Sequence, residues 1–197
     1  MSIYKSALGE DFKHLHPMLQ KRYSFIQQTF IAKGKMRKII HGASWLKPLL
    51  YLGIRRKLLF PEQGVDIPFQ ITNRSINTGN DIYWERIFYF HGKARYFNAT
   101  MSLNDASGIV QDYLGDPAVI YSDLHFYVMD DGSLLISSGK QRLVLGKLEI
   151  PMPRWFQGIA EVREKYIEES KQFHINVHVK NPIIGLIFAY EGEFTYE

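Results

Sequence analysis

The sequence contains no cysteine among its 197 residues. This absence excludes disulfide scaffolds, zinc fingers, iron–sulfur clusters and cysteine nucleophiles. No stretch reaches the roughly 18 consecutive apolar residues of a membrane-spanning helix, and residues 1–25 lack the apolar run of a signal peptide. Together these absences predict a cytoplasmic protein, and they leave open a peripheral place at a membrane surface.

Motifs for cofactors and catalysis are missing as well. The sequence has no Gly-x-Gly-x-x-Gly, no Walker A motif and no Gly-x-Ser-x-Gly. His174 and His178 lie four residues apart in a segment that alternates like a strand, which separates them by about 13 Å, too far to share one metal ion. We therefore expect no metal, no cofactor and no assignable catalytic residue.

The composition is that of one globular domain spanning residues 1–197. Hydrophobic residues make up 46% of the chain and aromatic residues 14%, and the aromatic content favours β-structure. Charge is uneven. Residues 1–60 carry twelve Lys or Arg and only Glu10 and Asp11, a net charge of +10, whereas residues 61–197 carry −6. The basic part either packs beside acidic strands or faces an anionic membrane, and no nucleic-acid-binding pattern supports a nucleic-acid partner.

The basic part, residues 1–60, is expected to be helical with one hairpin. A short helix is predicted over residues 10–22, with Pro17 as a point where it splits. Residues 24–40 predict a hairpin that turns at Lys33-Gly34-Lys35. Residues 47–60 predict a second helix, which is either mostly buried or an interfacial anchor that docks on a membrane or partner through Arg55, Arg56 and Lys57.

Residues 61–197 predict a succession of strands with short connections. The expected strands are 67–76, 81–90, 93–103, 108–114, 119–129, 133–138, 141–150, 159–168, 172–180 and 184–196. Short connections force antiparallel pairing, and about ten such strands curl into a barrel or a two-sheet sandwich. The predicted fold is therefore mainly β, an antiparallel barrel or sandwich with one or two N-terminal helices.

The most informative segment is the hairpin that turns at His91-Gly92. A two-residue turn places Trp84, Arg86 and Phe88 on one face, with Arg95 and Phe97 across from them. Arginines on an apolar face are costly unless an anion or a carboxylate meets them. Arg142 shows the same alternation with Val144. The pattern predicts a ligand site made of Arg86, Arg95, Arg142, Trp84, Phe88 and Phe97. The alternatives are internal ion pairing with Glu85, Glu149, Glu161 or Glu191, or arginine stems that lie along an exposed aromatic surface.

Several short motifs resemble a bacterial family, the domain of unknown function DUF4166. They are Pro61–Phe69, Trp84–Phe88, Asp112–Gly115, Leu148–Pro153, Asn181–Gly185 and Tyr190–Gly192. The resemblance extends from about Met36 to the C-terminus, and Arg86 lies inside one of the motifs. Similar domains occur alone in bacilli, or fused to dehydrogenase-like domains or to membrane-spanning segments. The resemblance implies no activity and transfers no catalytic residue.

Three functions remain open. The first is non-enzymatic binding of a small amphipathic anion or lipid inside the barrel or cleft. The second is a membrane-peripheral or protein-interaction module that docks through the basic segment. A dehydrogenase-like protein is one partner beside which such a module could act. The third is an enzyme, which a buried carboxylate with a raised pKa beside a pocket would favour.

Overall fold

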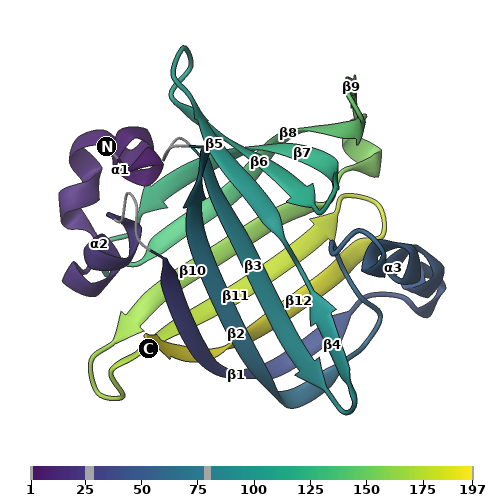
Figure 1. The fold of residues 1–197 in the computed structure, drawn as a ribbon, viewed down its shortest axis with the longest axis horizontal. Helices are drawn as coiled ribbons and strands as arrows, with labels where there is room; N and C mark the ends of the chain where they lie inside the picture. The colour runs from purple at the N-terminus through teal and green to yellow at the C-terminus, as the bar shows by residue number, and fades with distance from the viewer. Residues whose placement is uncertain (1, 25–28, 78–80, 197) are drawn as a thin grey trace.

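The computed structural model describes residues 2–24, 29–77 and 81–196 (Figure 1). Its secondary structure is mostly antiparallel β-strand. The strands are β1 (Phe30–His41), β2 (Gly64–Ile76), β3 (Asp81–Phe90), β4 (Lys93–Tyr96), β5 (Ala99–Asn104), β6 (Ile109–Gly115), β7 (Ala118–Val128), β8 (Leu134–Leu145), β9 (Leu148–Pro151), β10 (Ile159–Ile167), β11 (Gln172–Asn181) and β12 (Gly185–Tyr196).

Ten of the described strands close into a barrel. Their order is β10-β11-β12-β1-β2-β3-β5-β6-β7-β8, and pairing of β10 with β8 closes the ring. Strands β4 and β9 are additions that pair with β3 and β8. The prediction of a mainly β fold is confirmed, and of its two forms the barrel is the one observed. Closure leaves no free edge and encloses an interior lined by every second side chain.

The N-terminal basic part also contributes a barrel strand. The hairpin predicted over residues 24–40 is wrong, because residues 30–41 form the single strand β1 between β12 and β2. Residues 25–28 lie outside the described residues. Gly34 is needed for close approach rather than for a turn, since a Cβ there would collide with the backbone carbonyl of Glu193.

The two strands predicted over 133–138 and 141–150 are divided differently in the structure. Residues 134–145 form the single strand β8, and after a turn at Gly146 residues 148–151 form β9. Its register against β7 shifts between Ser122 and Leu124, which marks a bulge. Gly139 lies at this irregularity, where a Cβ would come within 2.7 Å of the His125 ring. The glycine therefore permits close packing rather than a reversal of the chain.

The strand predicted over 93–103 is interrupted. Strand β3 pairs first with β5 and then with β4, and the chain changes course at Phe97 and Asn98 between them. Beyond this fork the segment after α3 lies against the barrel wall. The Asn98 amide donates to the Lys57 carbonyl at 2.8 Å, and the Asp116 amide donates to the Arg56 carbonyl at 2.7 Å.

Short helices lie at both ends of the barrel. Helices α1 (Ile3–Leu8), η1 (Gly9–His14) and α2 (Pro17–Tyr23) are together at one end, and the chain does break at Pro17 as predicted. The other short helices are η2 (Ser44–Leu46), α3 (Lys47–Ile54) and η4 (Arg154–Phe156). Figure 1 shows α1 and α2 at one side of the barrel and α3 and β9 at the opposite side.

Candidate functional site: the barrel cavity

The barrel encloses a cavity of about 640 Å³. This volume lies within the range of sites that bind small molecules and cofactors. Its walls are mainly aliphatic and aromatic and come from strands all around the ring, including Leu124, Ile136, Val162, Ile175, Val177 and Ile187. Few polar side chains interrupt this surface, and two of them are charged and buried.

The first exception is Arg86, on the inward face of β3. Its Nε donates to the Phe97 carbonyl at 2.7 Å, and its guanidinium lies 4.0 Å from the centroid of the Phe97 ring. The residue is only 7% exposed, and it lines the cavity. A buried cation held this way adds a fixed positive charge to an otherwise apolar wall.

The second exception is Asp112, on β6. Its side chain lines the cavity, is buried, and leaves Oδ1 without a hydrogen-bond partner among the described residues. Burial raises the pKa of Asp112 to about 7, against the lowering effect of the Arg86 charge. The cavity therefore carries a net positive charge from this pair below about pH 7, and the two charges compensate each other above it.

This arrangement suits an amphipathic anion. Arg86 supplies the positive charge, protonated Asp112 supplies a hydrogen-bond donor, and the apolar walls accommodate a hydrocarbon body. An unpaired oxygen in a buried carboxyl group is unfavourable, which makes a ligand or a water at this point energetically useful.

The structure divides the residues that the sequence nominated as ligand-binding. Trp84, Arg86 and Phe97 line the cavity. Phe88 faces inward but is packed in the core, with its ring about 5 Å from those of Phe60, Phe69 and Tyr190. It is not among the cavity-lining residues described here.

Arg95 and Arg142 are also outside the described lining of the cavity. Arg95 forms an ion pair with Glu62. Arg142 pairs with Glu149 of β9 at 2.8 Å and stacks over the Tyr121 ring on the outside of the barrel. The expectation that Arg142 points inward is wrong: Gln141 and Leu143 line the cavity instead, because β8 bulges and then continues past Gly139. Its pairing with Glu149 is the alternative that the sequence left open.

Asp112 is the functional candidate that sequence reasoning missed. It alternates with Val110 and Leu114 along β6, and both of these neighbours are apolar. The alternation argument that found Arg86 would have found Asp112 as well, had it been applied to acids. The pairing of the two residues, however, depends on β3 and β6 both facing one interior across β5, which only the closed barrel shows.

One end of the cavity is closed by the N-terminal helices. Tyr4 of α1 contacts the cavity wall, and its hydroxyl accepts a hydrogen bond from the Trp84 indole at 2.7 Å. Arg22 and Glu164 form an ion pair at 2.6 Å with side chains only 1% exposed, and the Tyr23 hydroxyl donates to Glu164 at 3.0 Å. Burial raises the pKa of Glu164, although Arg22 and Tyr23 oppose the shift. This end is packed against the barrel, and the Arg22–Glu164 ion pair lies at its centre.

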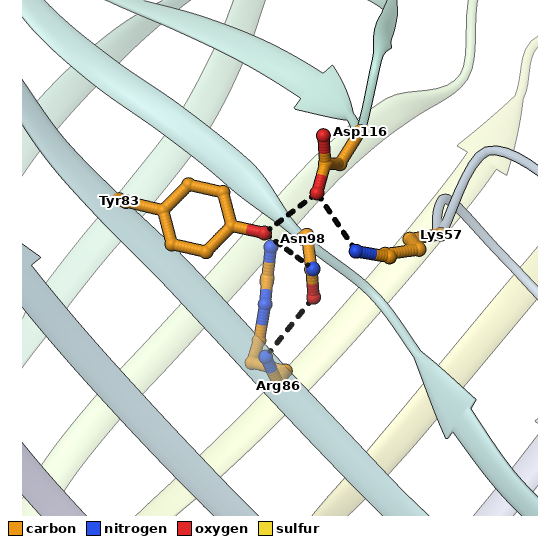
Figure 2. Close-up of polar contacts among 5 residues, drawn as sticks. All are labelled: Lys57, Tyr83, Arg86, Asn98 and Asp116. Atoms are coloured by element: carbon orange, nitrogen blue, oxygen red, sulfur yellow. Dashed lines mark hydrogen bonds and ion pairs between the residues drawn. The ribbon is translucent and has the colours of Figure 1, made fainter.

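The fork between β4 and β5 is tied to the segment after α3 by a polar network (Figure 2). Lys57 Nζ and the Tyr83 hydroxyl both donate to Asp116, at 2.8 Å and 3.0 Å, and Asn98 Nδ2 donates to the Tyr83 hydroxyl at 2.7 Å. The hydrogen bond from Lys57 is the main cause that lowers the pKa of Asp116. Lys57, nominated as a docking residue, is thus engaged within the molecule.

The opposite end of the cavity reaches solvent beside α3 and η4. Cavity-lining residues at this end are strongly exposed, with Leu49 at 60%, Leu52 at 63% and Phe156 at 69%. Leu50 is the one buried residue of α3. The interpretation of residues 47–60 as a mostly buried helix is therefore wrong. Arg55 and Arg56 are exposed here, and Arg56 lines the cavity opening.

Among the residues that the structure describes, no helix is both long enough and apolar enough to span a bilayer. Within the same residues, no group of three or more His, Asp or Glu side chains is arranged to hold a metal ion.

Fold and site together define a closed antiparallel β-barrel with a mainly apolar internal cavity that has Arg86 and Asp112 buried in its wall. The family model described as "Domain of unknown function (DUF4166)" matches residues 15–194, and the chain belongs to this family. The resemblance found in the sequence is thereby confirmed. The chain is also 41% identical over 202 residues to "Uncharacterized protein YndH" of Bacillus subtilis (strain 168), an alignment that covers 100% of this chain and 97% of that protein.

Proposed function

We propose that this protein is a non-enzymatic binding protein for a small amphipathic anion, such as a fatty acid or related lipid. The observation that carries the proposal is the large apolar cavity with Arg86 and Asp112 buried in its wall. The acyl body lies among the aliphatic walls, and its acidic group meets Arg86. Trp84 and Phe97 flank the acidic group, because both line the cavity beside Arg86.

The experiment compares ligands that differ only in their polar end. Dodecanoate and dodecanol are each titrated against anilinonaphthalene sulfonate bound to the protein, and loss of fluorescence reports displacement. We expect Arg86→Gln to weaken dodecanoate by about ten- to a hundredfold, the usual worth of a hydrogen bond to a charged group. Dodecanol should be affected much less, because its hydroxyl group does not need the positive charge.

Arg142→Gln is the matched control. It removes the same charge from the outer surface of β8, so dodecanoate affinity should not change. A second variant, Ala160→Phe, adds bulk to the cavity wall and should weaken both ligands. Equal losses from Arg86→Gln and Arg142→Gln, or no displacement by either ligand in the wild type, would contradict the proposal.

An enzyme is the second candidate, because Asp112 is a buried carboxyl group with a raised pKa beside a pocket. Glu164 is a second buried carboxyl group with a raised pKa in the lining of the same cavity, but it is already engaged by Arg22 and Tyr23. The two candidates are separated by recovering the ligand after prolonged incubation. A binding protein returns the compound unchanged, whereas an enzyme returns a product whose formation stops in Asp112→Asn.

A further inference from the structure

The cavity opening is bordered by side chains that are apolar and exposed at once. We define the apolar rim as Leu49, Leu52, Leu143, Ile150 and Phe156, which all line the cavity and are all exposed large hydrophobic residues. They come from α3, from the β8–β9 hairpin and from η4. Segments far apart in the sequence thus place apolar side chains around one opening. Exposed apolar residues without a shared role are usually scattered singly over a protein surface.

Aromatic side chains extend this rim. Trp155 is 60% exposed, and its ring centroid is 5.5 Å from that of Phe156. Trp45 and Tyr51, on η2 and α3, are exposed to a similar degree. Exposed tryptophan and tyrosine beside aliphatic residues are typical of side chains that lie at the boundary between lipid and water.

The charge around the rim is mainly positive. Residues 43–61 contain Lys47, Arg55, Arg56 and Lys57 and no acidic residue. Lys147 and Arg154 approach from the β8–β9 hairpin and η4, and the acid between them, Glu149, is paired with Arg142. Lys57 is bonded to Asp116, but no ion pair is described for Lys47, Arg55, Arg56, Lys147 or Arg154. An apolar patch bordered by such cations is complementary to an anionic lipid surface.

We propose that this end of the barrel docks on an anionic bilayer, with the apolar rim in the interfacial layer and the cations at the lipid headgroups. Docking in this orientation turns the cavity opening toward the lipid, so that an acyl chain can enter without crossing water. The apolar rim and its cations form a membrane-docking surface in addition to the proposed ligand site. It does not depend on the ligand, because the rim and its cations are exposed whether or not the cavity is filled.

The test is flotation of the full chain with vesicles. Vesicles of phosphatidylcholine mixed with phosphatidylglycerol should carry the protein, vesicles of phosphatidylcholine alone should carry much less, and salt should weaken the binding. Trp155→Ser combined with Phe156→Ser should lower partitioning by at least about tenfold, since two aromatic side chains no longer insert. Lys47→Glu combined with Arg55→Glu should lower it by about tenfold or more at low salt.

Tyr127→Ser combined with Met129→Ser provides the matched control. These exposed apolar residues lie on β7 and just after it, near the helices that close the other end, so partitioning should stay at the wild-type value. Tryptophan emission gives an independent readout. Trp45 and Trp155 are exposed and Trp84 is buried, so brominated lipids should quench the wild type and should scarcely quench a Trp45→Phe, Trp155→Phe protein.

Three results would overturn the docking proposal. One is failure to float with phosphatidylglycerol vesicles at low salt, and another is unchanged flotation in both the rim and the charge variants. The third is a dimer without vesicles that the rim variants dissociate, which would assign the rim to a second copy of the chain. Because flotation needs no ligand in the cavity, docking and ligand binding can fail separately.

Discussion

The two ends of the barrel both carry short helices that contain apolar and basic residues, but the helices are buried to different extents. At the closed end, α1 and α2 bury Tyr4, Leu19 and Tyr23 completely or nearly so. At the open end, α3 buries Leu50 and exposes Leu49 and Leu52. Both regions belong to the basic first 60 residues of the chain. Apolar and basic residues in a helix therefore do not by themselves decide whether the helix is packed or exposed.

The difference follows from what lies opposite each cation. Arg22 of α2 meets Glu164 of β10 at 2.6 Å, and aromatic rings surround its guanidinium, among them Phe30 at 4.2 Å. Arg55 and Arg56 have no described acidic partner and stay in water. A cation can be buried only where a partner compensates its lost hydration. The closed end supplies that partner for Arg22, whereas no acidic partner is described for Arg55 and Arg56 at the open end.

We expect the largest loss of stability from a substitution at the closed end. Arg22→Met leaves Glu164 buried without its cation, and we expect the free energy of unfolding to fall by about 3–5 kcal/mol. Replacing both partners, with Arg22→Met and Glu164→Leu, should recover most of this loss, because no buried charge remains. Urea denaturation measures both. A single variant as stable as the wild type would show that the pair contributes nothing to the closed end.

The same substitution at the two ends should have unequal effects. Leu19→Ala removes a fully buried side chain of α2, and we expect a loss of about 2–5 kcal/mol. Leu52→Ala removes a side chain of α3 that is 63% exposed, and its effect should stay within about 0.5 kcal/mol. Thermal denaturation of the two variants side by side checks this contrast, and similar losses would mean that α3 is packed.

A smaller effect depends on pH and concerns the cavity between the two ends. Because burial raises the pKa of Asp112 to about 7, the folded state binds its proton more tightly than the unfolded state does. Stability from this group is then present at low pH and is lost as pH rises through about 7. Asp112→Asn should therefore be more stable than the wild type by about 2–4 kcal/mol well above pH 7, and the difference should shrink near about pH 5.

The control for this prediction is Asp123→Asn, which changes an acid on the next strand that does not line the cavity. Its stability difference from the wild type should not follow the same pH course. If Asp112→Asn and the wild type keep a constant difference across this range, Asp112 is ionised throughout and the cavity has no charge switch.

Much of the barrel could be predicted from local patterns. Strands 81–90, 159–168 and 172–180 were placed within a residue or two of β3, β10 and β11, because alternation and turn residues define them locally. Glycine was the main source of error. The sequence predicts turns at Gly34 and between residues 138 and 141, yet Gly34 and Gly139 are interior strand positions where another backbone or side chain passes too close for a Cβ.

The candidate site could be predicted only in part, for a related reason. Trp84, Arg86 and Phe97 follow from one hairpin whose turn and register were placed correctly. Arg142 was misplaced because a bulge in β8 reversed the inward parity, and a bulge leaves no clear mark in the alternation. The meeting of Arg86 with Asp112, and of α3 with η4 at one opening, depends on ring closure and not on neighbouring residues.

Native mass spectrometry of the purified protein tests directly whether the cavity holds an amphipathic anion. We expect an added mass in stoichiometric amount on the wild-type protein. Denaturing extraction should identify it as a compound with an acidic group and a long apolar body, and Arg86→Gln should lose this added mass. An extracted compound without an acidic group, or an added mass retained equally by Arg86→Gln, would contradict the account.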